Sequence, residues 1–377
     1  MTTTCEAAQS VAVPFLDLKQ QNRKLAPGLD EAVQAVLRSA SYIQGPAVTE
    51  FERAFAEYCG VREAIAVDSG TAALHLTLLA LEIGAGDEVV VPTNTFIATA
   101  AAVHVTGARP VFIDADPDNW QLDVQKLPET ITDRCRAVIG VHLYGQPLFL
   151  PPAVKACADR GIHFIEDAAQ AHGARFGGRR VGSFGRAACF SFYPAKNLGA
   201  FGDGGAITTD DPELGVRLRR LLDHGRVSKY LHQEVGFNYR MDAIQGAVLN
   251  YKLQSLDGWN QQRRLWASRY RERLANLPLR LPACISDSEP VHHLFPVCCE
   301  RRDALAEFLA RRSIQTGVHY PIPLHLQPAF RHLGYKLGDF PVAERIGKDV
   351  LSLPIFPEMT EEQFEHVCNS IADFFDQ

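Results

Sequence analysis

The feature that most constrains the fold is an alternation, between residues 64 and 209, of short apolar runs with segments of helical pattern. Apolar runs this short, bounded by turn residues, are typical of buried strands. Helical segments such as 71–81 and 152–159 lie between several of them. The seven predicted strands are residues 64–67, 88–91, 110–113, 137–141, 162–165, 187–192 and 206–208.

This order predicts an α/β fold, in which a mostly parallel sheet is covered on both faces by helices. Ligands of such sheets bind beyond the carboxyl ends of the strands. After residue 214 the pattern changes, and we expect an N-terminal arm (1–12), a large domain (13–255) and a smaller α+β C-terminal domain (256–377). The C-terminal elements follow a long helical pattern over 241–274 and are a strand near 293–298 and helices over 302–311 and 361–375.

Charge and composition exclude several classes of protein. The 38 Lys and Arg residues against 44 Asp and Glu residues give a net charge of -6, whereas a nucleic-acid binder usually carries a basic excess. No apolar run reaches the ~18 residues that a membrane span needs, and the first ten residues lack the parts of a signal peptide. The nine cysteines include no C-x-x-C pair, which favours reduced thiols over a metal site. We expect a cytoplasmic protein that binds neither nucleic acid nor a membrane.

Two loops that follow predicted strands carry groups suited to an anion and to a proton. Residues 68–71 form an Asp-Ser-Gly-Thr turn that opens a helix, where backbone N–H groups and hydroxyls suit a phosphate, unless Asp68 or Ser69 is simply a helix cap. Glu166 and Asp167 end the apolar run at 162–165. A carboxylate shielded from water there could hold a proton on a heterocycle nitrogen, with a helix cap again as the alternative.

Two further loops add an amine and a polar turn. The loop at 191–199 places Lys196 after a buried strand and before a Gly-rich stretch, whose backbone can approach a flat ligand. Most lysines are solvated, but a desolvated amine at such a place can form an imine with a carbonyl cofactor and later move protons. The polar turn at 236–242 precedes an apolar helix, which Asn238 or Asp242 could simply cap.

A phosphate turn, a buried acid and a reactive amine together describe the needs of pyridoxal 5'-phosphate (PLP). This cofactor requires an anchor for its phosphate, a partner for its pyridine nitrogen and an amine for its aldehyde. Phe96 follows the strand at 88–91 and is placed to stack on the cofactor ring, with core packing as the alternative.

Four segments in this order resemble the DegT-type sugar aminotransferases, which are PLP enzymes of fold type I in the aspartate aminotransferase superfamily. The segments are residues 68–74, 166–170, 191–199 and 236–242, and the resemblance extends from residues 14–18 to the C-terminal helix. It implies the three-layer fold of that superfamily. It also implies a nucleotide-linked keto sugar as acceptor and L-glutamate as amino donor.

The resemblance further implies roles for individual residues. Lys196 would form the imine with the cofactor and act as the base of the proton shift, and Asp167 would be the partner of the pyridine nitrogen. The other cofactor contacts would be Gln170 at the hydroxyl side, Gly70, Thr71 and Ser191 at the phosphate, and Asn238 at the phosphate of the neighbouring subunit's cofactor. The role of Asn238 implies a homodimer with shared active sites.

For the substrate, the segment 317–325 resembles a family loop that borders the sugar pocket, so that His319 and Tyr320 are candidate contacts. Lys229 is a candidate for a diphosphate, as are Arg226 and Arg240, although solvated surface positions are the alternative for each. The amino-acid sequences of residues 145–147 and 319–321 favour amination at C3 of a 6-deoxyhexose, with C4 left open.

Lys196 also bears on the choice between an aminotransferase and the alternative functions. A dehydratase offshoot of the family carries histidine at this position, so the lysine favours transamination. A PLP-dependent sugar dehydratase and a non-catalytic, PLP-binding regulatory homologue stay open as alternatives. A nicotinamide dehydrogenase would need a G-x-G-x-x-G turn after the first strand, which this chain lacks.

Overall fold

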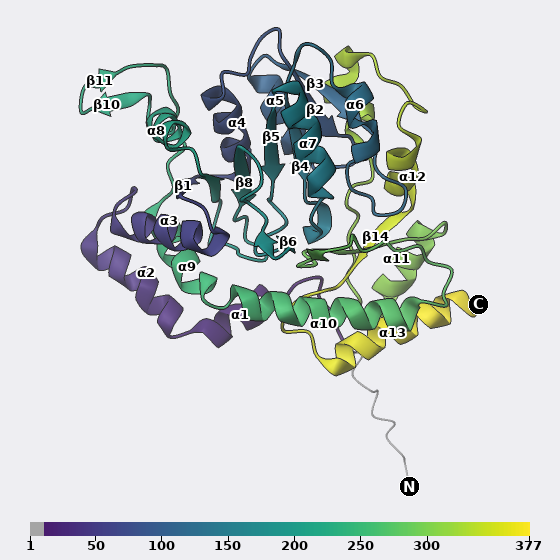
Figure 1. The fold of residues 1–377 in the computed structure, drawn as a ribbon. Coiled ribbons are helices and arrows are strands. Elements are labelled where there is room, and N and C mark those ends of the chain that lie inside the picture. Colours follow the sequence, from purple (N-terminus) through teal and green to yellow (C-terminus); the bar gives the residue numbers. More distant parts are fainter. Residues whose placement is uncertain (1–10) are drawn as a thin grey trace.

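A seven-stranded sheet forms the centre of the molecule in the computed structural model, which describes residues 11–377 (Figure 1). The strand order is β1-β9-β8-β5-β4-β2-β3, and β9 runs antiparallel to both of its neighbours while the remaining pairs are parallel. The strands are β1 (Glu63–Val67), β2 (Glu88–Pro92), β3 (Arg109–Ile113), β4 (Cys135–Val141), β5 (His163–Asp167), β8 (Ala187–Ser191) and β9 (Gly205–Thr209). The predicted mostly parallel α/β sheet is therefore confirmed.

Alternate residues of the strands pack against two different helical layers, as the period of two requires. On β1, Ile65 and Val67 belong to the core beneath α4 (Gly70–Ala80), α5 (Ile97–Val105) and α8 (Pro212–Leu221). Ala64 and Ala66 belong to the core on the opposite face, with α3 (Pro46–Cys59) and α9 (Ala243–Leu253). Farther along that opposite face, α7 (Leu150–Arg160) packs with alternate residues of β2, β4 and β5, beside the short α6 (Leu127–Thr130). Two helices precede these layers, α1 (Leu18–Leu25) and α2 (Gly28–Ser39).

The helical pattern over 241–274 is two helices, so the prediction of one long helix was wrong. The first is α9, the second is α10 (Leu256–Leu274), and the chain turns at Gln254 and Ser255 between them. Leu253 and Leu256 are buried in the same core cluster on either side of the turn. The turn lets the chain bury both leucines and directs the rest of α10 toward a different core. The local apolar pattern does not indicate this change of direction.

That different core lies around α10, which runs beside α13 (Glu361–Phe375) along one edge of the molecule (Figure 1). It includes residues of α11 (Arg302–Arg311) and of the antiparallel pair β13 (Phe295–Cys298) and β14 (Val350–Leu353), with α12 (Pro341–Asp349) preceding β14. Val13 is fully buried in this cluster and forms a bridge with Ile314. The first ten residues of the expected arm lie outside the described residues, and the domain boundaries stay a prediction.

Short strand pairs connect these parts. Ser288–Glu289 (β12) pairs with Arg175–Phe176 (β6), which also pairs with Arg179–Arg180 (β7). A hairpin of Arg226–Ser228 (β10) and Leu231–His232 (β11) extends away from the body of the molecule (Figure 1). Within residues 11–377, no helix is both long and apolar enough to cross a membrane.

Candidate active site

A cavity of about 570 Å³ opens beyond the carboxyl ends of the central strands and reaches the C-terminal part of the chain. Nine of the residues that the sequence singles out line it: Gly70, Thr71, Phe96, Asp167, Gln170, Ser191, Lys196, His319 and Tyr320. Segments that are distant in sequence thus meet in one place, and those at strand ends do so because the carboxyl ends of parallel strands share an edge of the sheet.

At one side of the cavity, the start of α4 approaches the end of β8 closely. A Cβ atom at Gly70 would lie 2.6 Å from the Cβ of Ser191, so this contact requires glycine. Ser69 caps the helix, because its Oγ accepts a hydrogen bond from the N–H of Ala72 at 3.1 Å. The first backbone N–H groups of a helix have no partner within it and carry the positive end of its dipole. The cap therefore still leaves backbone N–H groups that could bind an anion, beside the hydroxyls of Thr71 and Ser191.

Asp167, the last residue of β5, is buried at the bottom of the cavity. Its Oδ2 accepts a hydrogen bond from the Thr99 hydroxyl at 2.8 Å, and its Oδ1 accepts one from the N–H of Ala169 at 3.2 Å. Burial raises the pKa of this carboxyl, and the two hydrogen bonds and the charge of Lys196 offset the rise only in part. A cation placed next to Asp167 would complete the stabilisation of its charge.

Lys196 lies in the same cavity, in a turn closed by a hydrogen bond from its backbone N–H to the Tyr193 carbonyl at 2.8 Å. Burial lowers the pKa of the amine to about 8, against an opposing effect of Asp167. The neutral fraction near neutral pH is therefore far larger than that of a solvated lysine, and this fraction can act as a nucleophile and a proton acceptor.

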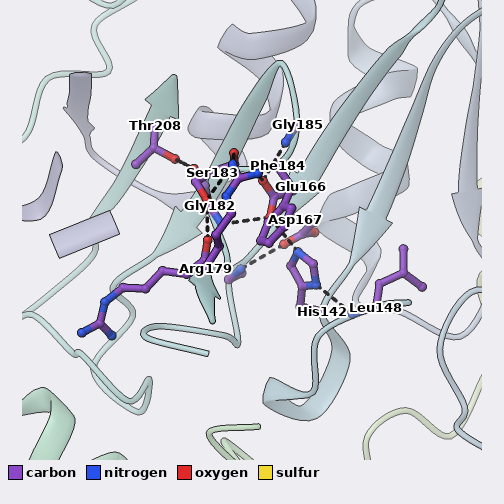
Figure 2. A network of polar contacts seen from close by, with 12 residues as sticks. His142, Leu148, Glu166, Asp167, Arg179, Gly182, Ser183, Phe184, Gly185 and Thr208 are labelled. Carbon is purple, nitrogen blue, oxygen red and sulfur yellow. Dashed lines mark hydrogen bonds and ion pairs between the residues drawn. The ribbon is translucent and has the colours of Figure 1, made fainter. Parts of the chain in front are cut away.

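Behind Asp167 lies a closed polar network around Glu166 (Figure 2). Glu166 accepts hydrogen bonds from the backbone N–H groups of Gly182 (2.9 Å), Phe184 (2.7 Å) and Gly185 (2.9 Å). Its Oε2 also lies 3.1 Å from Nε2 of His142, whose Nδ1 accepts from the N–H of Leu148 at 3.0 Å. The Leu148 bond places the imidazole proton on Nε2, so His142 donates to Glu166.

The outer wall of the cavity joins strand ends to the C-terminal part of the chain. Gln170 donates to the Tyr320 hydroxyl at 3.2 Å and accepts from the N–H of Tyr144 at 2.6 Å. The Tyr144 hydroxyl donates to the His319 carbonyl at 2.9 Å, and Nδ1 of His319 lies 3.0 Å from the Ser352 hydroxyl. Burial raises the pKa of Tyr320, which keeps its phenol protonated.

Phe96 lies at the mouth of the cavity with 52% of its surface exposed, 5.6 Å from the ring of Tyr320. An exposed ring of this kind is not part of the core, so core packing does not explain Phe96. Its stacking on a cofactor stays a prediction.

Two candidate residues lie outside the cavity of this chain. Asn238 forms a backbone bridge with Asp223, ahead of α9, and Lys229 is exposed at the tip of the β10–β11 hairpin. The predicted partner of Asn238 is the cofactor phosphate of the neighbouring subunit, and that of Lys229 is the diphosphate of the substrate. Neither group is part of a single chain. Arg226 and Arg240 pair with Asp223, the latter at 2.8 Å, which is a structural use of these cations.

The residues of the site that sequence reasoning missed include Thr99, His293 and Arg263. Thr99 lies one helical turn after Phe96, and this spacing was a usable signal, because residues three apart share a helix face. Arg263 belongs to the polar run Gln-Gln-Arg-Arg at 261–264, which reads as a solvated surface. Only tertiary packing buries it.

These residues fit PLP. The start of α4, with its backbone N–H groups and the neighbouring hydroxyls of Thr71 and Ser191, suits a phosphate. The incompletely stabilised Asp167 suits a protonated ring nitrogen, and the desolvated amine of Lys196 suits an aldehyde.

Comparisons with known proteins agree with this arrangement. The dTDP-3-amino-3,4,6-trideoxy-alpha-D-glucose transaminase of Streptomyces venezuelae is 47% identical over 369 residues, which cover 97% of each chain. The dTDP-3-amino-3,6-dideoxy-alpha-D-galactopyranose transaminase of Aneurinibacillus thermoaerophilus is 45% identical over 359 residues, covering 95% of this chain and 98% of that protein. The crystal structure of Streptomyces venezuelae DesV matches with a TM-score of 0.95 at 46% identity, over 97% of this chain and 99% of that one. Residues 25–372 match the sequence model of the DegT/DnrJ/EryC1/StrS aminotransferase family, and the chain therefore belongs to this family.

Proposed function

We propose that this protein transfers the amino group of L-glutamate to the C3 carbonyl of a nucleotide-linked 6-deoxy keto sugar. By family membership, the chain is a sugar aminotransferase with PLP as its cofactor. The observation that carries the chemistry is the meeting of Lys196 and Asp167 in one cavity, where burial leaves the amine partly neutral and the carboxylate in need of a cation.

When bound, PLP supplies an aldehyde that amines attack and a ring that takes up the electrons of a broken C–H bond. Asp167 holds a proton on the ring nitrogen, in a position that Thr99 fixes through its hydrogen bond. Lys196 would hold the aldehyde of the cofactor, and its amine, when free, would accept and return a proton within the cavity. The start of α4 and Ser191 bind the phosphate.

The acceptor sugar lies against the outer wall in this proposal. His319 and Tyr320 border the cavity there, and the neutral phenol of Tyr320 can donate to a sugar hydroxyl. We favour C3 over C4 because the names of the Streptomyces venezuelae and Aneurinibacillus thermoaerophilus transaminases each specify a 3-amino sugar. The nucleotide diphosphate then extends toward the mouth, where Lys229 of a partner subunit is the proposed contact.

The proposed homodimer places Asn238 and Lys229 at the partner's cavity. Apolar residues of the protruding segment support this: Tyr230 is 84% exposed and Val235 is 89% exposed, which a partner would cover. Co-expression of Lys196→Ala and Asn238→Ala chains tests the sharing of sites. A mixed dimer regains one intact site and therefore activity, whereas recovery will be absent if each chain builds its own site alone.

The substrate is tested by incubating the holoenzyme with L-glutamate and a panel of dTDP- and UDP-linked 3-keto and 4-keto sugars. We expect 2-oxoglutarate and a 3-amino sugar, identified by mass spectrometry and NMR. A 4-amino product would replace C3 by C4, and a deoxygenated sugar without 2-oxoglutarate would indicate a dehydratase. Cofactor binding without a half-reaction with any amino acid would indicate the regulatory homologue.

A further inference from the structure

Tyr144 lies next to the outer wall of the cavity but does not line it, in the short turn Leu143–Gly145 that follows β4. Only 3% of its surface is exposed, and its backbone has a φ of 62° and a ψ of 4°. This left-handed conformation is uncommon for residues other than glycine, and a bulky residue keeps it only where the surroundings impose it. The neighbours of Tyr144 therefore have to hold it in place.

Two hydrogen bonds hold the backbone of Tyr144. Its N–H donates to Oε1 of Gln170 at 2.6 Å, and its carbonyl accepts from the N–H of Leu294 at 3.3 Å. A backbone N–H can only donate, so the first bond fixes which end of the Gln170 amide faces Tyr144. The amide nitrogen of Gln170 consequently faces the other way, where it donates to the Tyr320 hydroxyl at 3.2 Å.

The hydroxyl of Tyr144 reaches the same wall at a second point. It donates to the carbonyl oxygen of His319 at 2.9 Å, and this carbonyl belongs to the peptide that leads into Tyr320. A closed ring of contacts results, in which Tyr144 holds Tyr320 at its backbone directly and at its hydroxyl through Gln170.

This ring orients the phenol of Tyr320. Its oxygen accepts a hydrogen bond from Gln170, so its own proton is directed elsewhere. Among residues 11–377 this hydroxyl donates to no acceptor, and Tyr320 lines the cavity. Burial raises the pKa of the phenol, which keeps the proton in place. The O–H group is therefore free to donate to a ligand in the cavity.

We propose that Tyr144 is a positioning residue for the acceptor half-reaction: its hydroxyl, through the His319 carbonyl, fixes the Tyr320 phenol as a hydrogen-bond donor to the keto sugar. The inference rests on the proposed function, which places the sugar against this wall. The imidazole of His319 has anchors of its own, the Ser352 hydroxyl at 3.0 Å and the stacked ring of Phe15 at 5.8 Å. It therefore depends less on Tyr144 than the phenol does.

Tyr144→Phe removes the hydroxyl but keeps the ring and the backbone bond to Gln170. We expect the pyridoxamine phosphate form of this variant to bind the keto sugar about 5-fold more weakly, the size of one neutral hydrogen bond, with an unchanged rate at saturation. The half-reaction of the PLP form with L-glutamate should keep its rate and its apparent Kd. Stopped-flow spectroscopy measures both half-reactions.

The matched control is Tyr270→Phe. It also removes a buried hydroxyl, which donates to the Pro354 carbonyl at 2.9 Å in the core around α10. This variant should be less stable to urea than wild type, because it too loses a buried hydrogen bond, but both of its half-reactions should be unchanged.

A double-mutant cycle with Tyr320→Phe separates positioning from a general structural role. If Tyr144 acts through the phenol, Tyr144→Phe should have little further effect on sugar binding once that hydroxyl is gone. Additive losses in the cycle overturn the proposal. Wild-type sugar affinity in Tyr144→Phe, or an equal slowing of both half-reactions, overturns it as well.

A measurement without substrate covers the case in which the proposed function fails. If the wild-type enzyme binds no keto sugar of the panel, the holoenzyme with Tyr320 replaced by 3-fluorotyrosine still reports on the ring by fluorine NMR. We expect a single resonance that Tyr270→Phe leaves unchanged and that Tyr144→Phe shifts or broadens. An unchanged resonance in Tyr144→Phe means that Tyr144 does not position Tyr320, whatever the substrate.

Discussion

The neighbouring residues Glu166 and Asp167 belong to two regions of the molecule with opposite electrostatic character. The strand places Glu166 on the face covered by α7, inside the network of His142 and the turn at 182–185, and Asp167 on the face of α4 and α5, in the cavity. Both are buried, and burial alone raises the pKa of each. Four donors to Glu166 nevertheless bring its pKa below the usual range, whereas the pKa of Asp167 stays raised.

The two carboxylates show that the same strand can carry one side chain that stabilises the fold and one that is available for chemistry. Around Glu166 the polar groups satisfy one another, so the region binds the chain to itself and has no capacity for a ligand. Around Asp167 the protein leaves a carboxylate and an amine incompletely paired. Such groups are costly in the free protein and are therefore available to cofactor and substrates.

The largest expected effect is on the cavity side, at Lys196. Lys196→Ala removes the amine that is proposed to form the imine and to carry the proton, and turnover should fall by at least about 1,000-fold. The visible chromophore that borohydride reduces should disappear as well, while the urea unfolding midpoint stays near that of wild type. A variant that keeps the wild-type rate would remove Lys196 from the mechanism.

Asp167→Asn comes next, with an expected fall of roughly 100- to 1,000-fold in kcat, similar to the loss of one preorganised electrostatic contact. The neutral amide cannot hold a proton on the ring nitrogen. Cofactor absorbance and stability should change little, because the phosphate and imine contacts remain. Rapid turnover in this variant, measured by coupled detection of 2-oxoglutarate, contradicts the role of Asp167.

Glu166→Gln should show the reverse pattern. The amide replaces a carboxylate that four donors stabilise, and one donor then faces an amide N–H, so the free energy of unfolding should fall by about 2–4 kcal/mol. The rate per folded molecule should stay within a few-fold of wild type. Urea unfolding followed by fluorescence measures the first quantity. If stability were unaffected and turnover lost, the distinction between the two regions would be wrong.

Thr99→Val removes the hydroxyl that binds Oδ2 of Asp167 but keeps the shape of the side chain. We expect kcat to fall by roughly 10-fold, the size of one hydrogen bond to a charged group. The acid limb of the pH–rate profile should move to higher pH, since the lost bond had stabilised the carboxylate. Thr99→Ser restores the donor and should restore both values, and an unshifted acid limb in Thr99→Val would argue against the contact.

The smallest expected effect is on the stability of the cofactor-free protein as a function of pH. The folded-state pKa of Glu166 is below its usual 4.5, so its contribution is present above that pH and is lost as the pH falls through the folded pKa. The raised pKa of Asp167 acts oppositely: its charge destabilises the fold as the pH rises above its usual 3.8. Urea titrations at a series of pH values should therefore show a flatter acid limb for Glu166→Gln and a gain above pH 3.8 for Asp167→Asn.

Much of the fold was predictable because its signals are local. Apolar runs of a few residues located the central strands, and the helices at 302–311 and 361–375 were located to the residue. The turn at Gln254 was not predictable, because the segments on both sides of it have helical pattern and the turn serves two separate cores. The antiparallel direction of β9 also depends on its pairing with β1 and β8, which the sequence of β9 alone does not indicate.

Strand period, turn residues and motif order are local properties, and they specify the sheet class and the residue types that PLP chemistry needs at strand ends. Tertiary structure alone decided how those residues are charged and paired. It buried Arg263 from a run that looks like surface, left Phe96 exposed at the mouth, and gave two adjacent acids opposite pKa shifts. The physical reason is that desolvation and hydrogen bonding depend on neighbours distant in the chain, whereas backbone preference does not.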